Sequence, residues 1–234
     1  MNEELTDEDL GKVCIVRNPR AKNVIARHKA DFIQITVPIY FSSRQIQEAI
    51  EQIRPRLVNL KPKPQLLFTT ETRLETMSFS LNIEKREVKN FHVALKDCVL
   101  NIICPASLNF DDLTVQNTIR NAFEHCLRNE AKRIFPPKLD LLARQHGFEY
   151  TGVGINKSKT RWGSCSSKKK INLSYFCLLL PEYLIDFIIL HELCHTIEMN
   201  HGDKFWQLLD RVSNNRAKKL TKGLKEKSML LVVV

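Results

Sequence analysis

The 234-residue sequence lacks any long apolar run. A membrane-spanning helix needs about 20 mostly apolar residues in succession, and the C-terminal MLLVVV is far shorter. The N-terminal MNEELTDEDL is acidic and has neither the basic nor the apolar region of a secretory signal peptide. These absences predict a cytoplasmic protein without a membrane partner.

Paired cysteine spacing is also missing. The seven cysteines are an odd number and are scattered along the chain. A disulfide framework normally shows an even number of cysteines at regular spacings. We therefore expect reduced thiols, which are usual in a cytoplasm.

Acidic residues are too few to balance the basic ones, since 26 Asp and Glu against 36 Lys and Arg give a net charge of +10. Residues 157–170 carry six basic residues and no acid, and residues 214–227 carry six basic residues against Glu226 alone. Such segments favour a nucleotide or nucleic acid as a partner. A solvated surface explains them equally well, because basic charge alone carries no sequence recognition.

The apolar pattern changes near residue 107. Before it, short alternating runs such as residues 32–37 predict strands, residues 42–60 predict an amphipathic helix, and KPKP at 61–64 predicts an extended connector. After it, helical stretches are frequent, and FPPK at 135–138 is expected to interrupt one of them. We predict an α+β protein with a β-rich N-terminal domain, residues 1–107, and a second domain, residues 108–234.

From Glu182 the chain is apolar on nearly every side, which is typical of a buried helix. At the end of this segment, three histidines and two glutamates lie within the eleven positions from His191 to His201. Buried polar groups need partners. A metal ion is the partner that best explains this concentration of imidazoles.

His191 and His195 are four residues apart, so on a helix they lie on one face, about 6 Å apart along the axis. Their imidazoles can therefore reach one zinc ion. Glu192 is placed to take a proton from metal-bound water, which is the chemistry of an HExxH motif. Zinc is inferred from the ligand type, and other divalent ions could occupy a three-histidine site.

The third ligand has two candidates. Glu198 lies seven residues from His191, about 10 Å along a straight helix, which is too far for a shared ion. His201 can approach the ion only if the helix stops first. Asn200 tolerates a left-handed backbone, and Asp203 is a natural cap for a following helix. We therefore expect His201 as the ligand, with a fourth position open to water.

HELCH, the following MNHGDKFW and the upstream TRWGSCSSKKKINLSY together resemble the YgjP-like family of predicted metal-dependent hydrolases, which is related to the SprT-like and WLM zinc peptidases. The resemblance implies a zincin-like catalytic domain with one zinc ion, held by His191, His195 and His201, and Glu192 as the general base. Cys194 stands where many members carry a small alanine, and no damage is expected because cysteine is also small. Relatives pair an edge strand with an extended substrate, and INLSY is the natural candidate for that strand.

The preferred function is zinc-dependent hydrolysis of a peptide or protein substrate. The resemblance leaves one enzymatic alternative, a nucleoside triphosphate (UTP) pyrophosphatase that would hold a nucleotide through the basic segments. A nucleic-acid-associated zinc-binding module is the non-enzymatic alternative, and it would need a fourth protein ligand. Arg161 is a candidate substrate-binding residue that could stabilise an oxyanion or a phosphate. A strand-end arginine beside a packed Trp162 is the structural alternative.

Overall fold

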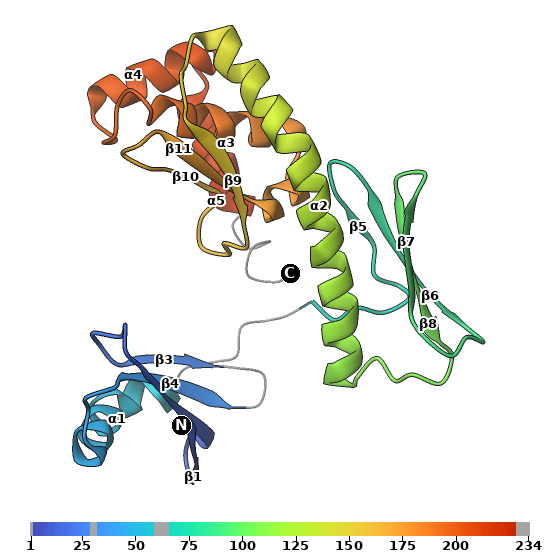
Figure 1. Cartoon of the computed structure of the whole chain (residues 1–234), viewed down its shortest axis with the longest axis vertical. Coiled ribbons are helices and arrows are strands. Elements are labelled where there is room, and N and C mark those ends of the chain that lie inside the picture. Colours follow the sequence, from blue (N-terminus) through green and yellow to red (C-terminus); the bar gives the residue numbers. More distant parts are fainter. Residues whose placement is uncertain (1, 29–31, 59–65, 228–234) are drawn as a thin grey trace. The chain divides into compact units, whose positions relative to one another are not determined.

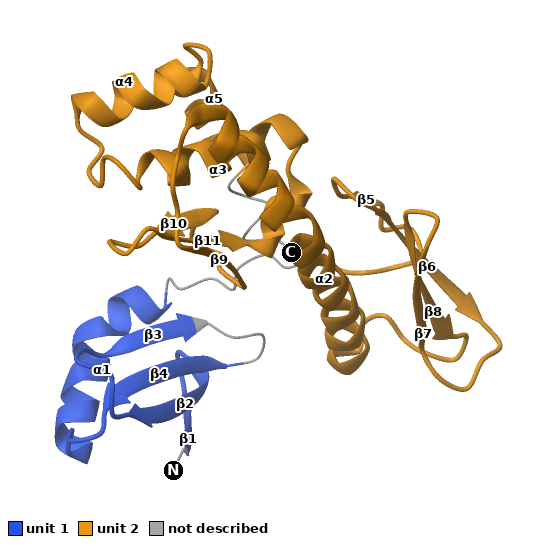
Figure 2. Cartoon of the chain, turned by 45° about the horizontal axis from the view of Figure 1, so that its top comes forward, with its two compact units in different colours: residues 1–64 blue, residues 65–234 orange. Residues whose placement is uncertain are grey.

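The computed structural model describes residues 2–28, 32–58 and 66–227 (Figure 1). The chain forms two compact units, Met1–Pro64 and Gln65–Val234 (Figure 2). The connector expected at residues 61–64 lies outside the described residues. Within the described ranges, no helix is both long enough and apolar enough to span a bilayer.

The first unit is a four-stranded mixed sheet covered by one helix (Figure 2). Its strands follow the order β1-β2-β4-β3, with β2 and β4 parallel and the other neighbours antiparallel. The elements are β1 (Asn2–Asp7), β2 (Gly11–Asn18), β3 (Ile25–His28), β4 (Ile33–Pro38) and α1 (Ser43–Val58). The alternation expected around residues 32–37 is confirmed, because every second side chain of β4 is buried against α1.

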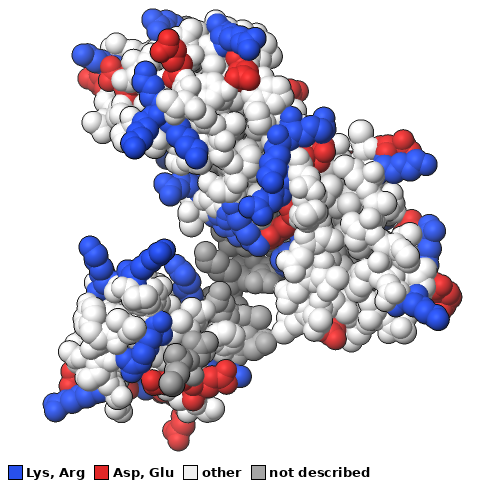
Figure 3. Space-filling model, viewed as in Figure 1, with Lys and Arg blue, Asp and Glu red and all other residues white. Residues whose placement is uncertain are grey.

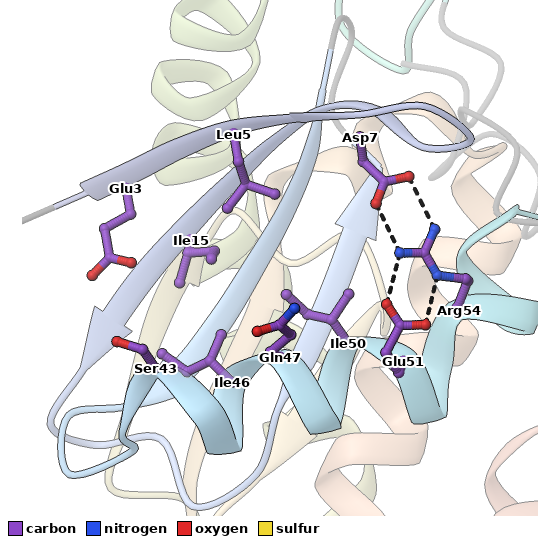
Figure 4. A pocket seen from close by; sticks show the side chains of 10 residues that line it. All are labelled: Glu3, Leu5, Asp7, Ile15, Ser43, Ile46, Gln47, Ile50, Glu51 and Arg54. Carbon is purple, nitrogen blue, oxygen red and sulfur yellow. Dashed lines mark hydrogen bonds and ion pairs between the residues drawn. The ribbon is translucent and has the colours of Figure 1, made fainter.

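A pocket of about 260 Å³ lies between β1 and α1 in this unit (Figure 4). Leu5, Ile15, Ile46 and Ile50 form its apolar wall. At one end the Arg54 guanidinium donates to both carboxylate oxygens of Asp7, at 3.0 and 2.8 Å, and it also donates to Glu51. These ion pairs tie β1 to the last turns of α1.

The second unit begins with a four-stranded sheet in the order β5-β6-β8-β7. Its strands are β5 (Leu74–Glu75), β6 (Ser80–Arg86), β7 (His92–Lys96) and β8 (Val99–Pro105). Buried side chains of β6 and β8 share one core with the long helix α2 (Leu113–His146). This shared core places the unit boundary at 64/65 and not at 107/108. The sequence changes from strands to helices near residue 107, but the strands before that residue and helix α2 after it pack in the same core.

Helix α2 runs without interruption through Pro136 and Pro137, so the interruption expected at FPPK is wrong. A proline inside a helix removes a backbone hydrogen bond and crowds the preceding turn. Packing outweighs that cost here, because Phe135 and Leu139 are both fully buried on either side of the prolines. Lys138 adds ion pairs of 2.7 Å to Glu182 and Asp186.

On the other side of α2 lies a small three-stranded sheet with the remaining helices (Figure 1). The elements are β9 (Gly152–Asn156), β10 (Gly163–Cys165), β11 (Lys170–Ser174), the 3₁₀ turn η1 (Tyr175–Leu179), α3 (Glu182–Cys194), α4 (Asp203–Val212) and α5 (Ala217–Lys227). The strand order is β10-β11-β9, with β10 antiparallel and β9 parallel to β11. INLSY therefore forms the central strand, and its expected role as an edge strand is wrong. Both of its edges are already paired, and β10 is the edge strand beside α3.

Candidate metal centre

Helix α3 ends where the histidines begin. It is apolar almost all round and buried, as its composition predicts, and its last turn carries His191 and Glu192. His195 is the C-terminal cap residue, and its backbone N–H donates to the His191 carbonyl. His201 lies in the segment between α3 and α4.

The three histidines converge through the same ring atom. The Nε2 atoms lie 3.2 Å apart for His191 and His195, 3.2 Å for His195 and His201, and 3.1 Å for His191 and His201. An ion about 2.0–2.1 Å from each nitrogen in a tetrahedral arrangement requires separations of about 3.3–3.4 Å. The three imidazoles therefore fit one zinc ion after movements of only a few tenths of an ångström.

The turn after α3 fixes the direction of the His195 lone pair. The His195 Nδ1–H donates to the Glu198 carbonyl oxygen at 3.0 Å. Because a carbonyl only accepts, the proton of the neutral ring lies on Nδ1, and Nε2 presents its lone pair to the other two histidines. Carbonyls commonly orient metal-binding imidazoles in this way. Glu198 thus contributes through its backbone, while its carboxylate is not a member of the cluster.

The chain reverses through tight turns and not through a left-handed Asn200. Thr196 N–H donates to Leu193 O at 2.9 Å, and Ile197 N–H donates to Cys194 O at 3.0 Å. Asn200 does not have a positive φ, so that expectation is wrong. Gly202, in an extended conformation, is the cap residue of α4, and Asp203 is the first helical residue instead of the cap.

The Phe205 ring contacts the imidazoles of all three histidines. This fully buried ring stacks on His195 with centroids 4.5 Å apart, and it meets His191 and His201 edge-on at 5.0 and 4.7 Å. The sequence indicated only a core residue at this position. Its position four residues after His201, in the first turn of α4, was the available signal for a contact with the site.

Burial favours the neutral form of His191 and His195. Burial, together with the smaller effects of the neighbouring His195 and His201, lowers the pKa of His191 to about 4. Burial also lowers the pKa of His195. Neutral rings with converging lone pairs form a site for a cation, because metal ligation requires the unprotonated imidazole.

Glu192 is a buried carboxyl group next to the cluster, with 6% of its surface exposed. Burial raises its pKa to about 8, and the positive charge of Arg161 opposes that rise. Its side chain lies against β10, where a Cβ on Gly163 would be 2.6 Å from Oε1 and 2.7 Å from Cγ. A metal ion held by the histidines would favour the ionised carboxylate.

The residues of the RWGSCS segment differ in exposure and in contacts. Arg161 is exposed, and its charge acts on Glu192. Trp162 packs against the core, and its carbonyl accepts from Ser174 N–H at 2.8 Å. Cys165 is half-buried, and burial raises the pKa of its thiol, as expected for an unreactive cysteine.

The cluster contains three protein ligands in the described part of the chain, with no further His, Cys, Asp or Glu ligand atom beside them. Cys194, within the same turn, is fully buried, and burial raises the pKa of its thiol to about 12. Structural zinc sites normally have four protein ligands, whereas catalytic sites keep one position open. Three protein ligands is the number usual for a catalytic zinc site.

A family model for the YgjP-like metallopeptidase domain matches residues 20–227. The chain belongs to the YgjP-like family. The match includes every residue of the histidine cluster together with Arg161 and Gly163. Comparison with curated proteins found no match.

Two solved structures resemble part of this YgjP-like chain. They are the metallopeptidase zymogens abylysin, from Pyrococcus abyssi, and jannalysin, from Methanocaldococcus jannaschii, each 26% identical. The similarity covers 39% of this chain and 91% and 93% of those chains, with TM-scores of 0.36 and 0.35. The family supports a metal-dependent hydrolase and gives no support to a nucleic acid partner.

Proposed function

We propose that the protein is a zinc-dependent peptidase in which His191, His195 and His201 hold the metal and Glu192 is the general base. The convergence of three Nε2 atoms beside a buried carboxyl group carries this proposal. The family match supports the peptide bond as the target. A bound zinc ion would supply Lewis acidity.

The protein side chains then perform proton transfer and charge stabilisation. Glu192 accepts a proton from the attacking water and returns it to the amine that leaves. The Arg161 guanidinium stabilises the negative charge that develops on the carbonyl oxygen. A cation bound by the histidines would favour the ionised form of Glu192, which is the form that accepts the proton.

Strand β10 offers a place for the substrate backbone. One edge of β10 pairs with β11, and no strand pairs with its other edge among the described residues. An extended peptide can add to such an edge through main-chain hydrogen bonds. Because Gly163 lies against Glu192, a peptide on this edge is brought to the general base.

The test combines metal content with peptide cleavage in the wild type, Glu192→Gln and His201→Ala. We expect one zinc per chain in the wild type and in Glu192→Gln, with peptide cleavage reduced about 10²- to 10⁴-fold in that variant. His201→Ala should lose most of its zinc and its cleavage activity. Undiminished cleavage by Glu192→Gln would contradict the assigned base. Hydrolysis of UTP but of no peptide would replace the peptidase by the pyrophosphatase alternative.

A further inference from the structure

Basic residues lie at both ends of β10. Of the six basic residues in 157–170, Lys157 and Lys159 form ion pairs with the buried carboxylate of Glu124. The other four are exposed and form no ion pair with any described residue: Arg161, Lys168, Lys169 and Lys170. Figure 3 shows Lys and Arg side chains spread over the visible face of this unit, with Asp and Glu side chains among them.

These four residues flank the strand on both sides. Arg161 comes two residues before β10 and is close enough to Glu192 to affect its pKa. The turn that follows β10 contains Lys168 and Lys169, and the charge of Lys169 acts on the Cys165 thiol at the end of the strand. With a rise of about 3.3 Å per residue in an extended chain, the four steps from Arg161 to Cys165 span roughly 13 Å, so the two basic groups are about this far apart or farther.

The lysine turn is held by its backbone, which leaves the side chains free. Thr151 Oγ1 donates to Lys168 O at 2.7 Å, and Thr151 N–H donates to Lys169 O at 3.0 Å. Lys169 N–H donates to Ser166 O at 2.8 Å. The two exposed ammonium groups therefore lie at this end of β10, and neither forms an ion pair with a described residue.

We propose that the peptide taken by this site is an extended segment with acidic side chains on both sides of the bond that is cut. This inference rests on the proposed peptidase function and specifies its substrate class. A peptide paired with the free edge of β10 runs past Arg161 at one end and past Lys168 and Lys169 at the other. Asp or Glu side chains on both flanks would meet these cations, whereas Lys or Arg side chains would be repelled.

The experiment uses the full-length, zinc-loaded protein and a pool of tryptic peptides from a whole proteome, with cleavage sites read by mass spectrometry. We expect Asp and Glu to be enriched on both flanks of the cut bond. The best-cleaved acidic peptide is then remade with each Glu replaced by Gln. The kcat/KM of the acidic form should exceed that of the amide form by about five- to tenfold at low ionic strength, since each exposed pair contributes modestly. Added salt should reduce this ratio, because it screens exposed charges.

The decisive variant is Lys168→Glu with Lys169→Glu, which should lower or invert the acidic preference. Its matched control is Lys222→Glu with Lys225→Glu on α5, which changes the net charge equally. Gly223 of α5 packs near Leu184 in the first turn of α3, at the opposite end of that helix from His191. The control variant should keep the acidic preference, and both variants should keep one zinc per chain.

The outcomes separate this inference from the function on which it rests. Cleavage without acidic enrichment, or an acidic preference unchanged in Lys168→Glu with Lys169→Glu, would overturn the substrate class and leave the peptidase intact. Failure of the zinc-loaded wild type to cut any peptide would overturn the peptidase proposal and this inference together.

Discussion

Gly163 and Glu192 fit against each other so closely that a single added methyl group cannot be accommodated without movement. A Cβ at position 163 would lie 2.6 Å from Oε1 of Glu192, 2.7 Å from Cγ and 2.9 Å from Cδ. Glycine in a strand often marks such a close approach. The backbone of β10 thereby forms the wall that holds the proposed general base.

Gly163→Ala should therefore displace Glu192 and impair catalysis more than stability. We expect kcat/KM for peptide cleavage to fall by about 100-fold or more, the range for losing a general base. The free energy of unfolding should fall by about 1–3 kcal/mol, as for overpacking. Zinc content should stay at one per chain, because the three atoms nearest to the added Cβ all belong to Glu192 and not to an imidazole.

Gly152→Ala in β9 is the control for this substitution. A Cβ at Gly152 would meet no atom within 4 Å, and neither glycine has a positive φ. The control should match the wild type in cleavage and zinc content. Equal effects of the two alanines would show that the contact with Glu192 does not matter.

The convergence of the three histidines could be predicted from the sequence because its geometry is mostly local. His191 and His195 lie in adjacent turns of one helix, so helical spacing alone brings them together. His201 required a reversal of the chain, and the sequence predicted the reversal but not its form. The chain reverses through turns with backbone hydrogen bonds and not through a left-handed Asn200. Hydrogen bonds between backbone groups do not require particular residue types, so the sequence does not indicate them.

Features that depend on distant segments could not be read from the sequence. INLSY has the alternation of a strand, but strand order decides whether it is an edge, and order depends on where β9 and β10 pair. The boundary at 64/65 depends on which segments share a core with α2. Gly163 contacts the site through tertiary packing, which spacing along the chain does not encode.

Phe205→Leu should weaken zinc binding without removing a ligand. The smaller side chain no longer stacks on His195 or supports the edges of His191 and His201. We expect zinc affinity to fall by about tenfold or more, the usual effect of losing a group that orients ligands. Competition with a chelator of known affinity measures this change.

Phe123→Leu is the matched control, since Phe123 is equally buried in the same core but packs against Phe68 and Phe79. Both variants should lower the free energy of unfolding of the metal-free protein. Only Phe205→Leu should change zinc affinity. A comparable loss of zinc affinity in Phe123→Leu would mean that Phe205 acts only through the stability of the core and not through its contacts with the imidazoles.

Pro137→Ala should stabilise the second unit. Pro137 is exposed and lacks the N–H that a helical residue donates to the carbonyl four residues earlier. Alanine restores that donor, and the gain in the free energy of unfolding should be at most about 3 kcal/mol. Thermal unfolding measures the effect, with Lys132→Ala as an exposed control on the same helix that should stay within about 0.5 kcal/mol of the wild type. A lower melting temperature for Pro137→Ala would mean that the helix depends on the proline geometry.

The ion pairs of Asp7 should make the stability of the first unit depend on pH in the acidic range (Figure 4). Hydrogen bonds from Arg54 lower the pKa of Asp7 from its ordinary 3.8 to about 2. A lowered folded-state pKa means that the stabilisation is complete above pH 3.8 and is lost as the pH falls toward 2. Asp7→Asn should therefore be less stable than the wild type near neutral pH, and the two should converge in acid. Urea unfolding followed by NMR signals from α1 measures this.

Asp9→Asn is the control, because that side chain is 67% exposed and lies 3.3 Å from the same guanidinium. A constant difference in the free energy of unfolding between Asp7→Asn and the wild type across the acidic range would exclude the ion pair as its cause.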